Sequence, residues 1–129
     1  MKESEVISNV AQRLSSALNE SDLAAFGDLL DPNARWGPLD STSPPCTNKK
    51  QVLSWYRRGA AAGASAQVTE VVVEGDHIMV GLSIEGLGDA DERTDHSSRW
   101  QVFTVRDGLI VDIVGFDSRS AAAQRAGVN

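Results

Sequence analysis

Asp117 is the residue of this sequence whose type and position most favour chemistry. It ends the run IVDIVGFDSRS (110–120), which is otherwise rich in strand-forming residues. A carboxylate is costly to bury unless it is paired, and one at the rim of an apolar pocket gains a raised pKa suited to proton transfer near neutral pH. Asp117 is therefore a candidate general acid or base. The alternative is a structural role, in which Asp117 caps the helix that follows it.

Tyr56 is the second candidate for a catalytic group. Its ring is apolar and its hydroxyl can donate a hydrogen bond to a ligand carbonyl, so it could polarise that oxygen. The alternative is a core tyrosine whose hydroxyl bonds a backbone carbonyl. Trp36, Trp55 and Trp100 are candidate flat walls of a ligand pocket, with core packing as the alternative for Trp36 and Trp55.

The remaining chemistry-bearing residues form no recognisable site. The acidic loop at 87–97 lacks calcium-loop spacing, and no glycine-rich phosphate loop follows a strand. Cys46 has no base near it in sequence, and His77 and His96 are expected at the surface. The sequence therefore predicts no metal and no cofactor.

Composition limits the class of protein. The chain has 129 residues with a net charge of −6 and a pI near 4.8, which disfavours nucleic acid and anionic membranes as partners. No run approaches the length of a membrane span, and the start of the chain lacks a signal-peptide pattern. We expect one domain over residues 1–129, located in the cytoplasm, where a lone cysteine stays reduced.

The hydrophobic period changes from that of helices to that of strands along the chain. Helical spacing predicts three helices. The first covers 5–19, the second is capped by Ser21 and ended by Pro32, and the third begins after Asn48. A short strand is expected at 34–36. Period-two patterns then predict strands, followed by a short terminal helix; the strands lie at 66–75, 77–86, 98–105 and 110–116, and the helix at 120–127. This order predicts an α+β domain, in which a curved antiparallel sheet wraps three N-terminal helices as a cone-shaped barrel.

Three motifs in this order resemble the nuclear transport factor 2-like superfamily, and more narrowly its SnoaL-like and ketosteroid-isomerase-like families. They are SDLAAFGDLLDPNARW, NKKQVLSWYRRG and RDGLIVDIVGF, and the resemblance covers about residues 5–120. Such domains include isomerases, cyclases, dehydratases, epoxide hydrolases and non-catalytic binding modules, so the resemblance implies a fold more firmly than a function.

The resemblance also excludes one activity. The three catalytic positions of ketosteroid isomerases fall on Leu14, on Gly37 or Pro38, and on Trp100, none of which can take the family's catalytic role. We therefore expect no isomerisation of steroids by that route.

The resemblance further implies which side chains face the cone. Trp100, Val102 and Thr104 are expected inward on one strand, with Val111, Ile113, Gly115 and Asp117 inward on the next. The expected ligand-lining residues are Trp36, Trp55, Trp100, Val102 and Ile113. The resulting hypothesis is a small-molecule-binding protein that acts as a cofactor-free cyclase or isomerase on a hydrophobic, polyketide-like carbonyl compound. The alternative is a ligand-binding or dimerisation module without catalysis.

The outer face of the sheet is expected to pair with a second copy of the chain. This register leaves an apolar outer face, and exposed apolar patches of this kind usually mark interfaces. A homodimer would cover it, unless residues 118–129 fold back over it. The residues assigned to this face are Phe103, Val105, Val114 and Phe116, beside Arg99, Gln101 and Asp112.

Overall fold

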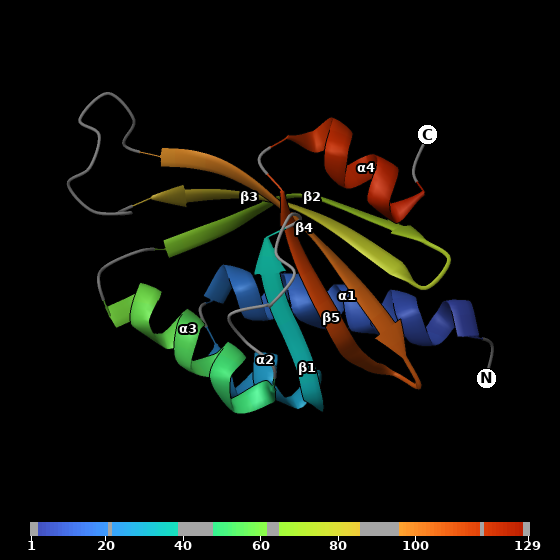
Figure 1. Ribbon diagram of the computed structural model, residues 1–129, viewed down its shortest axis with the longest axis horizontal. Helices are drawn as coiled ribbons and strands as arrows, with labels where there is room; N and C mark the ends of the chain where they lie inside the picture. Colours follow the sequence, from blue (N-terminus) through green and yellow to red (C-terminus); the bar gives the residue numbers. More distant parts are fainter. Residues whose placement is uncertain are drawn as a thin grey trace.

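The fold consists of four helices and five strands among the residues that the structure, a computed structural model, describes (Figure 1). These residues are 3–20, 22–38, 48–61, 65–85, 96–116 and 118–127. The elements in chain order are α1 (Glu3–Glu20), α2 (Leu23–Asp28), β1 (Leu30–Pro38), α3 (Lys49–Ala61), β2 (Ser65–Glu74), β3 (His77–Glu85), β4 (His96–Arg106), β5 (Leu109–Phe116) and α4 (Arg119–Ala126).

The strands form one curved sheet in the order β1-β5-β4-β3-β2. The pairs from β2 to β5 are antiparallel, whereas β1 runs parallel to β5. The turn between β4 and β5 has positive φ at both Asp107 (55°) and Gly108 (81°), as a tight hairpin turn requires. The sheet stays open, with β1 and β2 as its edges, and the expected α+β architecture is confirmed.

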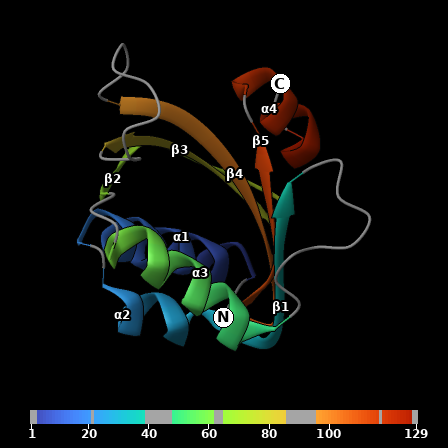
Figure 2. The same ribbon diagram turned by 60° about the vertical axis from the view of Figure 1, so that its left-hand side comes forward.

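The helices divide between the two faces of the sheet. Figure 2 shows α1, α2 and α3 inside the concave side of the curved sheet and α4 on the convex side. The larger core lies on the concave side and joins α1, α2 and α3 to the sheet. Its largest fully buried side chains include Leu14, Phe26, Val52, Ile78, Val80, Phe103, Ile110 and Ile113.

The smaller core lies under α4 on the convex side. Three alanines of α4 pack on the sheet, against Met79, Val102 and Phe116. Two ionic contacts hold the helix at its ends: Arg119 makes a two-point contact with Glu70 at 2.9 and 2.7 Å, and Arg125 lies 3.8 Å from Asp112. Helix α4 therefore covers part of the face that was expected to pair with a second copy of the chain.

The facing expected for β4 is wrong. Phe103 and Val105 lie in the concave core, whereas Trp100 and Val102 lie on the convex side with α4. Because side chains alternate along a strand, a one-residue error moves every side chain to the other face. Both faces of β4 are apolar here, since each is covered by helices, so hydrophobicity alone did not distinguish them.

The facing of β5 agrees better with expectation, since Ile113 is inward and Asp112 points to the convex side. Ile110, however, is buried in the concave core in place of Val111. The register between β4 and β5 shifts next to Thr104 and Val105, and this irregularity moves the start of β5 by one residue.

Two helix starts also differ from expectation. The N-cap of α2 is Asp22, whose side chain accepts from the Ala25 amide at 3.1 Å, rather than Ser21. The N-cap of α4 is Ser118, so capping, the structural alternative for Asp117, is performed by its neighbour. The expected cap of α3 is confirmed, because Asn48 Oδ1 accepts from the Gln51 amide at 2.9 Å.

The second helix is shorter than expected and the first strand longer. Helix α2 ends at Asp28, and Pro32, expected to end a helix, lies within β1. Proline is tolerated there because β1 is an edge strand, whose outer amides need no partner. Within the described residues, no helix has both the length and the apolar character that crossing a membrane requires.

Candidate functional site

The concave face holds one buried polar side chain among the described residues, Gln101 of β4. It is 8% exposed, and its Oε1 accepts a hydrogen bond of 3.2 Å from the hydroxyl of Tyr56 on α3. The Tyr56 hydroxyl therefore donates to a side chain on the facing strand, which differs from the alternative of a hydroxyl bonded to a backbone carbonyl. The bond also directs the Gln101 amide nitrogen, which is a donor, away from Tyr56.

Two pairs of aromatic rings include residues of α3. Tyr56 packs on Phe26 with ring centroids 4.7 Å apart. Next to it, Trp55 stacks at 4.9 Å on Trp36 of β1, and Arg58 lies 5.6 Å from the Trp55 ring. Trp55 is 43% exposed, so this stack marks an outer edge of the concave region, where α3 meets β1.

The indole nitrogen of Trp36 is unusual in this environment. Its Nε1 is buried and has no hydrogen-bond partner. Among the described residues, no other buried side-chain nitrogen or oxygen lacks a partner. An indole N–H can only donate, and a buried donor without an acceptor costs about 1–3 kcal/mol.

Gly115 leaves space beside Gln101. The two residues are paired across β4 and β5, so both face the concave side. A Cβ added at Gly115 would have one atom of the described residues within 4 Å, the carbonyl oxygen of Gly37 at 4.0 Å. The floor of the sheet next to the polar pair is therefore not filled by the described side chains.

The structure brings some of the predicted site residues together and separates others. Tyr56, Trp36 and Trp55 lie along one side of the concave region, and Ile113 lies buried in its floor, paired with Trp36. Trp100 and Val102 are on the opposite face, so the geometric reason for expecting them to line the cone is lost. Asp117 lies outside the described residues.

Gln101 is the residue that the sequence reasoning placed on the wrong face. A signal for it existed, because Gln101 stands between Trp100 and Val102 in a strand that is otherwise mostly apolar. A polar side chain inside such a strand must be hydrogen-bonded or at a functional site.

The pKa shifts resolved among the described residues belong to the ion pair on the convex side. The hydrogen bond and the charge of Arg119 lower the pKa of Glu70, and Glu70 in turn raises the pKa of Arg119. Among the described residues, no cluster of three or more His, Cys, Asp or Glu side chains could hold a metal ion.

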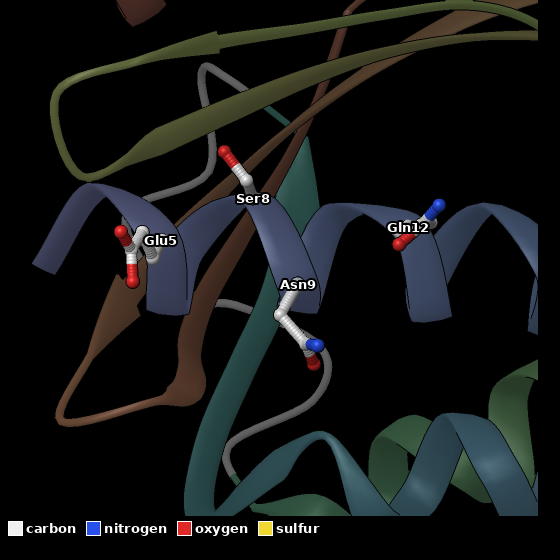
Figure 3. A pocket seen from close by; sticks show the side chains of 4 residues that line it. All are labelled: Glu5, Ser8, Asn9 and Gln12. Carbon is white, nitrogen blue, oxygen red and sulfur yellow. The ribbon is translucent and has the colours of Figure 1, made fainter. Parts of the chain in front are cut away.

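A shallow depression of about 360 Å³ on α1 is lined by four polar residues, Glu5, Ser8, Asn9 and Gln12. Figure 3 shows Ser8 and Asn9 pointing to opposite sides of the helix, so the four side chains do not converge on a common point. This depression is therefore a weaker candidate site than the region around Gln101.

The curved sheet wrapped around three helices is the nuclear transport factor 2-like fold, and solved structures support this class. A protein called Bal32a, from a soil-derived mobile gene cassette, superposes with a TM-score of 0.72 at 17% identity over 97% of this chain and 98% of that one. The profile of the SnoaL-like domain family matches residues 11–113, so the chain belongs to the SnoaL-like domain family.

Two further solved structures carry functional names. A proposed polyketide cyclase from Sinorhizobium meliloti has a TM-score of 0.66 at 20% identity, over 84% of this chain and 94% of that one. A proposed ketosteroid isomerase from Kribbella flavida has a TM-score of 0.71 at 18% identity, over 89% of this chain and 79% of that one. Identities this low support the fold alone. No curated protein matches the sequence.

Proposed function

We propose that this protein binds a hydrophobic small molecule with a carbonyl oxygen on the concave side of its sheet. The observation that carries the proposal is the Gln101–Tyr56 pair at 3.2 Å, next to the unfilled position at Gly115. The aromatic rings of Phe26 and Trp36 supply apolar surface on the helix side and at the β1 edge. Pockets of this kind, apolar with a few polar groups, are typical of small-molecule sites.

The polar pair suits an acceptor oxygen. When Gln101 Oε1 accepts from Tyr56, the amide –NH₂ of Gln101 is the group that can donate to a ligand. A neutral amide donor favours a carbonyl over a cation, and it stabilises negative charge that develops on that oxygen.

We further propose that Asp117 is the general acid or base of a cofactor-free reaction. Two observations support this role: Ser118 takes the capping position of α4, and Gly115, two residues before Asp117, faces the concave side. In the proposed step, the Asp117 carboxylate takes a proton from the carbon next to the carbonyl. The bonding electrons move to the oxygen, which Gln101 holds, and return of the proton at another carbon completes an isomerisation or permits ring closure. The names of the two solved structures above point to chemistry of this class.

Binding can be tested with two nearly isosteric probes. We expect 2-acetylnaphthalene to bind more tightly than 2-isopropenylnaphthalene, in which a CH₂ group replaces the carbonyl oxygen. Loss of one hydrogen bond of about 0.5–1.5 kcal/mol corresponds to about two- to tenfold in affinity. Titration calorimetry on the wild type and on Gln101→Leu measures this, with Glu70→Gln on the convex side as the control. Equal affinity of the wild type for both probes would rule out the proposed carbonyl recognition.

Catalysis is tested separately, by exchange of the methyl protons of 2-acetylnaphthalene with D₂O, followed by NMR. We expect the protein to accelerate exchange and Asp117→Asn to abolish the acceleration while it still binds the ketone. Binding without accelerated exchange would favour the alternative, a ligand-binding module without chemistry. The proposed catalysis, unlike the proposed binding, depends on Asp117, so Asp117→Asn separates the two.

A further inference from the structure

The indole N–H of Trp36 is a donor that the proposed carbonyl site does not use. Trp36 Nε1 is buried and has no acceptor among the described residues, although its ring is held in place by the Trp55 stack at 4.9 Å. Proteins seldom leave a buried polar side-chain atom unpaired, so such an atom calls for a specific explanation.

The position of Trp36 relates it directly to the Gln101 site. Trp36 pairs with Ile113 on β5, and β5 pairs on its other edge with β4, where Gly115 lies opposite Gln101. Trp36 and Gln101 thus lie on the two strands that flank β5. Since neighbouring strands are about 4.8 Å apart, the two backbones are separated by about 10 Å across the sheet. Trp36 and Gly115 both belong to the concave side, with the unfilled position between the two donors.

The surroundings of Trp36 disfavour a positively charged ligand. The Trp55 ring that stacks on it already has a cation beside it, since the Arg58 guanidinium lies 5.6 Å from its centroid. A second cation would be repelled there. An indole N–H cannot accept a hydrogen bond, so a ligand that carries only donor groups gains nothing from it.

We propose, on the basis of the function proposed above, that Trp36 Nε1 is the second hydrogen-bond donor of the ligand site. The ligand is then a flat, apolar compound with two acceptor oxygens at opposite ends, one bound by Gln101 and the other by Trp36. Trp36 thereby determines specificity between mono-oxygenated and di-oxygenated compounds.

The test compares 2-acetylnaphthalene with 2,6-diacetylnaphthalene, whose carbonyl groups lie at opposite ends of the ring system. We expect the wild type to bind the diketone about two- to tenfold more tightly than the monoketone, as one additional hydrogen bond implies. Trp36→Phe, which keeps an aromatic ring but has no donor, should bind the two ketones with equal affinity, so the ratio of the two affinities is the measured quantity. An unchanged preference in Trp36→Phe would refute the role of Trp36 and leave the carbonyl site intact.

A second measurement needs no change at Trp36. The indole N–H proton of Trp36, assigned among three tryptophans by Trp55→Phe and Trp100→Phe spectra, should move downfield when the diketone binds. If this resonance already lies downfield in the free protein and does not move, water or another acceptor holds the donor and the inference fails. If neither ketone binds the wild type, both this inference and the proposed function fail.

Discussion

Gly81 on β3 is the position where the smallest change should have the clearest effect. A Cβ built there comes within 2.8 and 2.9 Å of Cη2 and Cε3 of the Trp100 indole, and Cζ3 is closer still. Gly81 and Trp100 face each other across β3 and β4, so the ring lies flat over the glycine on the convex side. Gly81→Ala is therefore a direct test of the facing of β4.

The size of the effect follows from how the clash can be relieved. The atoms in contact belong to a rigid ring rather than to the end of a flexible chain, so the whole indole must rotate off the sheet. Overpacking of this kind costs about 1–3 kcal/mol. For a chain of 129 residues, each kcal/mol lowers Tm by about 4 °C, so we expect Tm to fall by about 4–12 °C.

Thermal and urea denaturation followed by circular dichroism measure this change. Gly115→Ala is the matched control, because it is also a strand glycine but its Cβ would meet nothing closer than 4.0 Å. We expect that control to be neutral or stabilising by up to about 1 kcal/mol, since alanine loses less backbone entropy on folding than glycine.

A double-mutant cycle separates the clash from other effects. In a Trp100→Leu background the ring is absent, so Gly81→Ala should cost little, and the coupling between the two positions should be about 1–3 kcal/mol. If Gly81→Ala has the same stability as the wild type, or the same cost with and without the indole, then Trp100 does not cover Gly81. The facing of β4 described here would then be wrong.

Four further expectations can be checked with standard assays. Arg119 holds the pKa of Glu70 below its ordinary value of 4.5, so the stabilisation from this pair is present above pH 4.5 and is lost as the pH falls through the lowered pKa. Urea denaturation curves of Glu70→Gln and the wild type should therefore differ at pH 7 and converge at acid pH. Asn48→Ala should cost about 1 kcal/mol in urea denaturation, whereas Asn48→Asp, which also caps, should cost little. The homodimer stays a prediction that light scattering decides, since a mass near 13.8 kDa refutes it. A substitution at Phe116 is not a clean test of the dimer, because Phe116 is buried beneath α4. Finally, 3-oxo-Δ5 steroids should not be isomerised, and measurable turnover would contradict the loss of the isomerase positions.

Local signals in the sequence predicted most of the elements. The cap at Asn48 and the glycine turn at Gly108 act within a few residues, so their patterns are visible without knowledge of the rest of the chain. The boundary between α2 and β1 was missed because Pro32 reads equally well as a helix stop and as an edge-strand residue. Only the place of β1 at the edge of the sheet distinguishes the two.

The candidate site was predictable only in part, because it depends on contacts between distant segments. Tyr56 was identified from its amphipathic side chain, but its partner Gln101 was placed on the outer face. Their hydrogen bond joins α3 to β4, and no local pattern encodes it. Trp100 was placed on the wrong face for a similar reason. It packs on the convex side with α4, and an alanine-rich helix gives little indication of which surface it covers.

The place of β5 in the sheet has a consequence for the synthesis of the protein. β5 separates β1 from β4, and its register joins Ile110 to Leu30 near the other end of the chain. While the ribosome is still making the last strand, β1 has no neighbour and part of the apolar surface of the helices has no cover. Contacts between such distant residues slow folding, and unpaired strand edges favour aggregation. The nascent chain is therefore expected to need chaperone protection until β5 has emerged, and truncations that remove β5 should accumulate as insoluble protein.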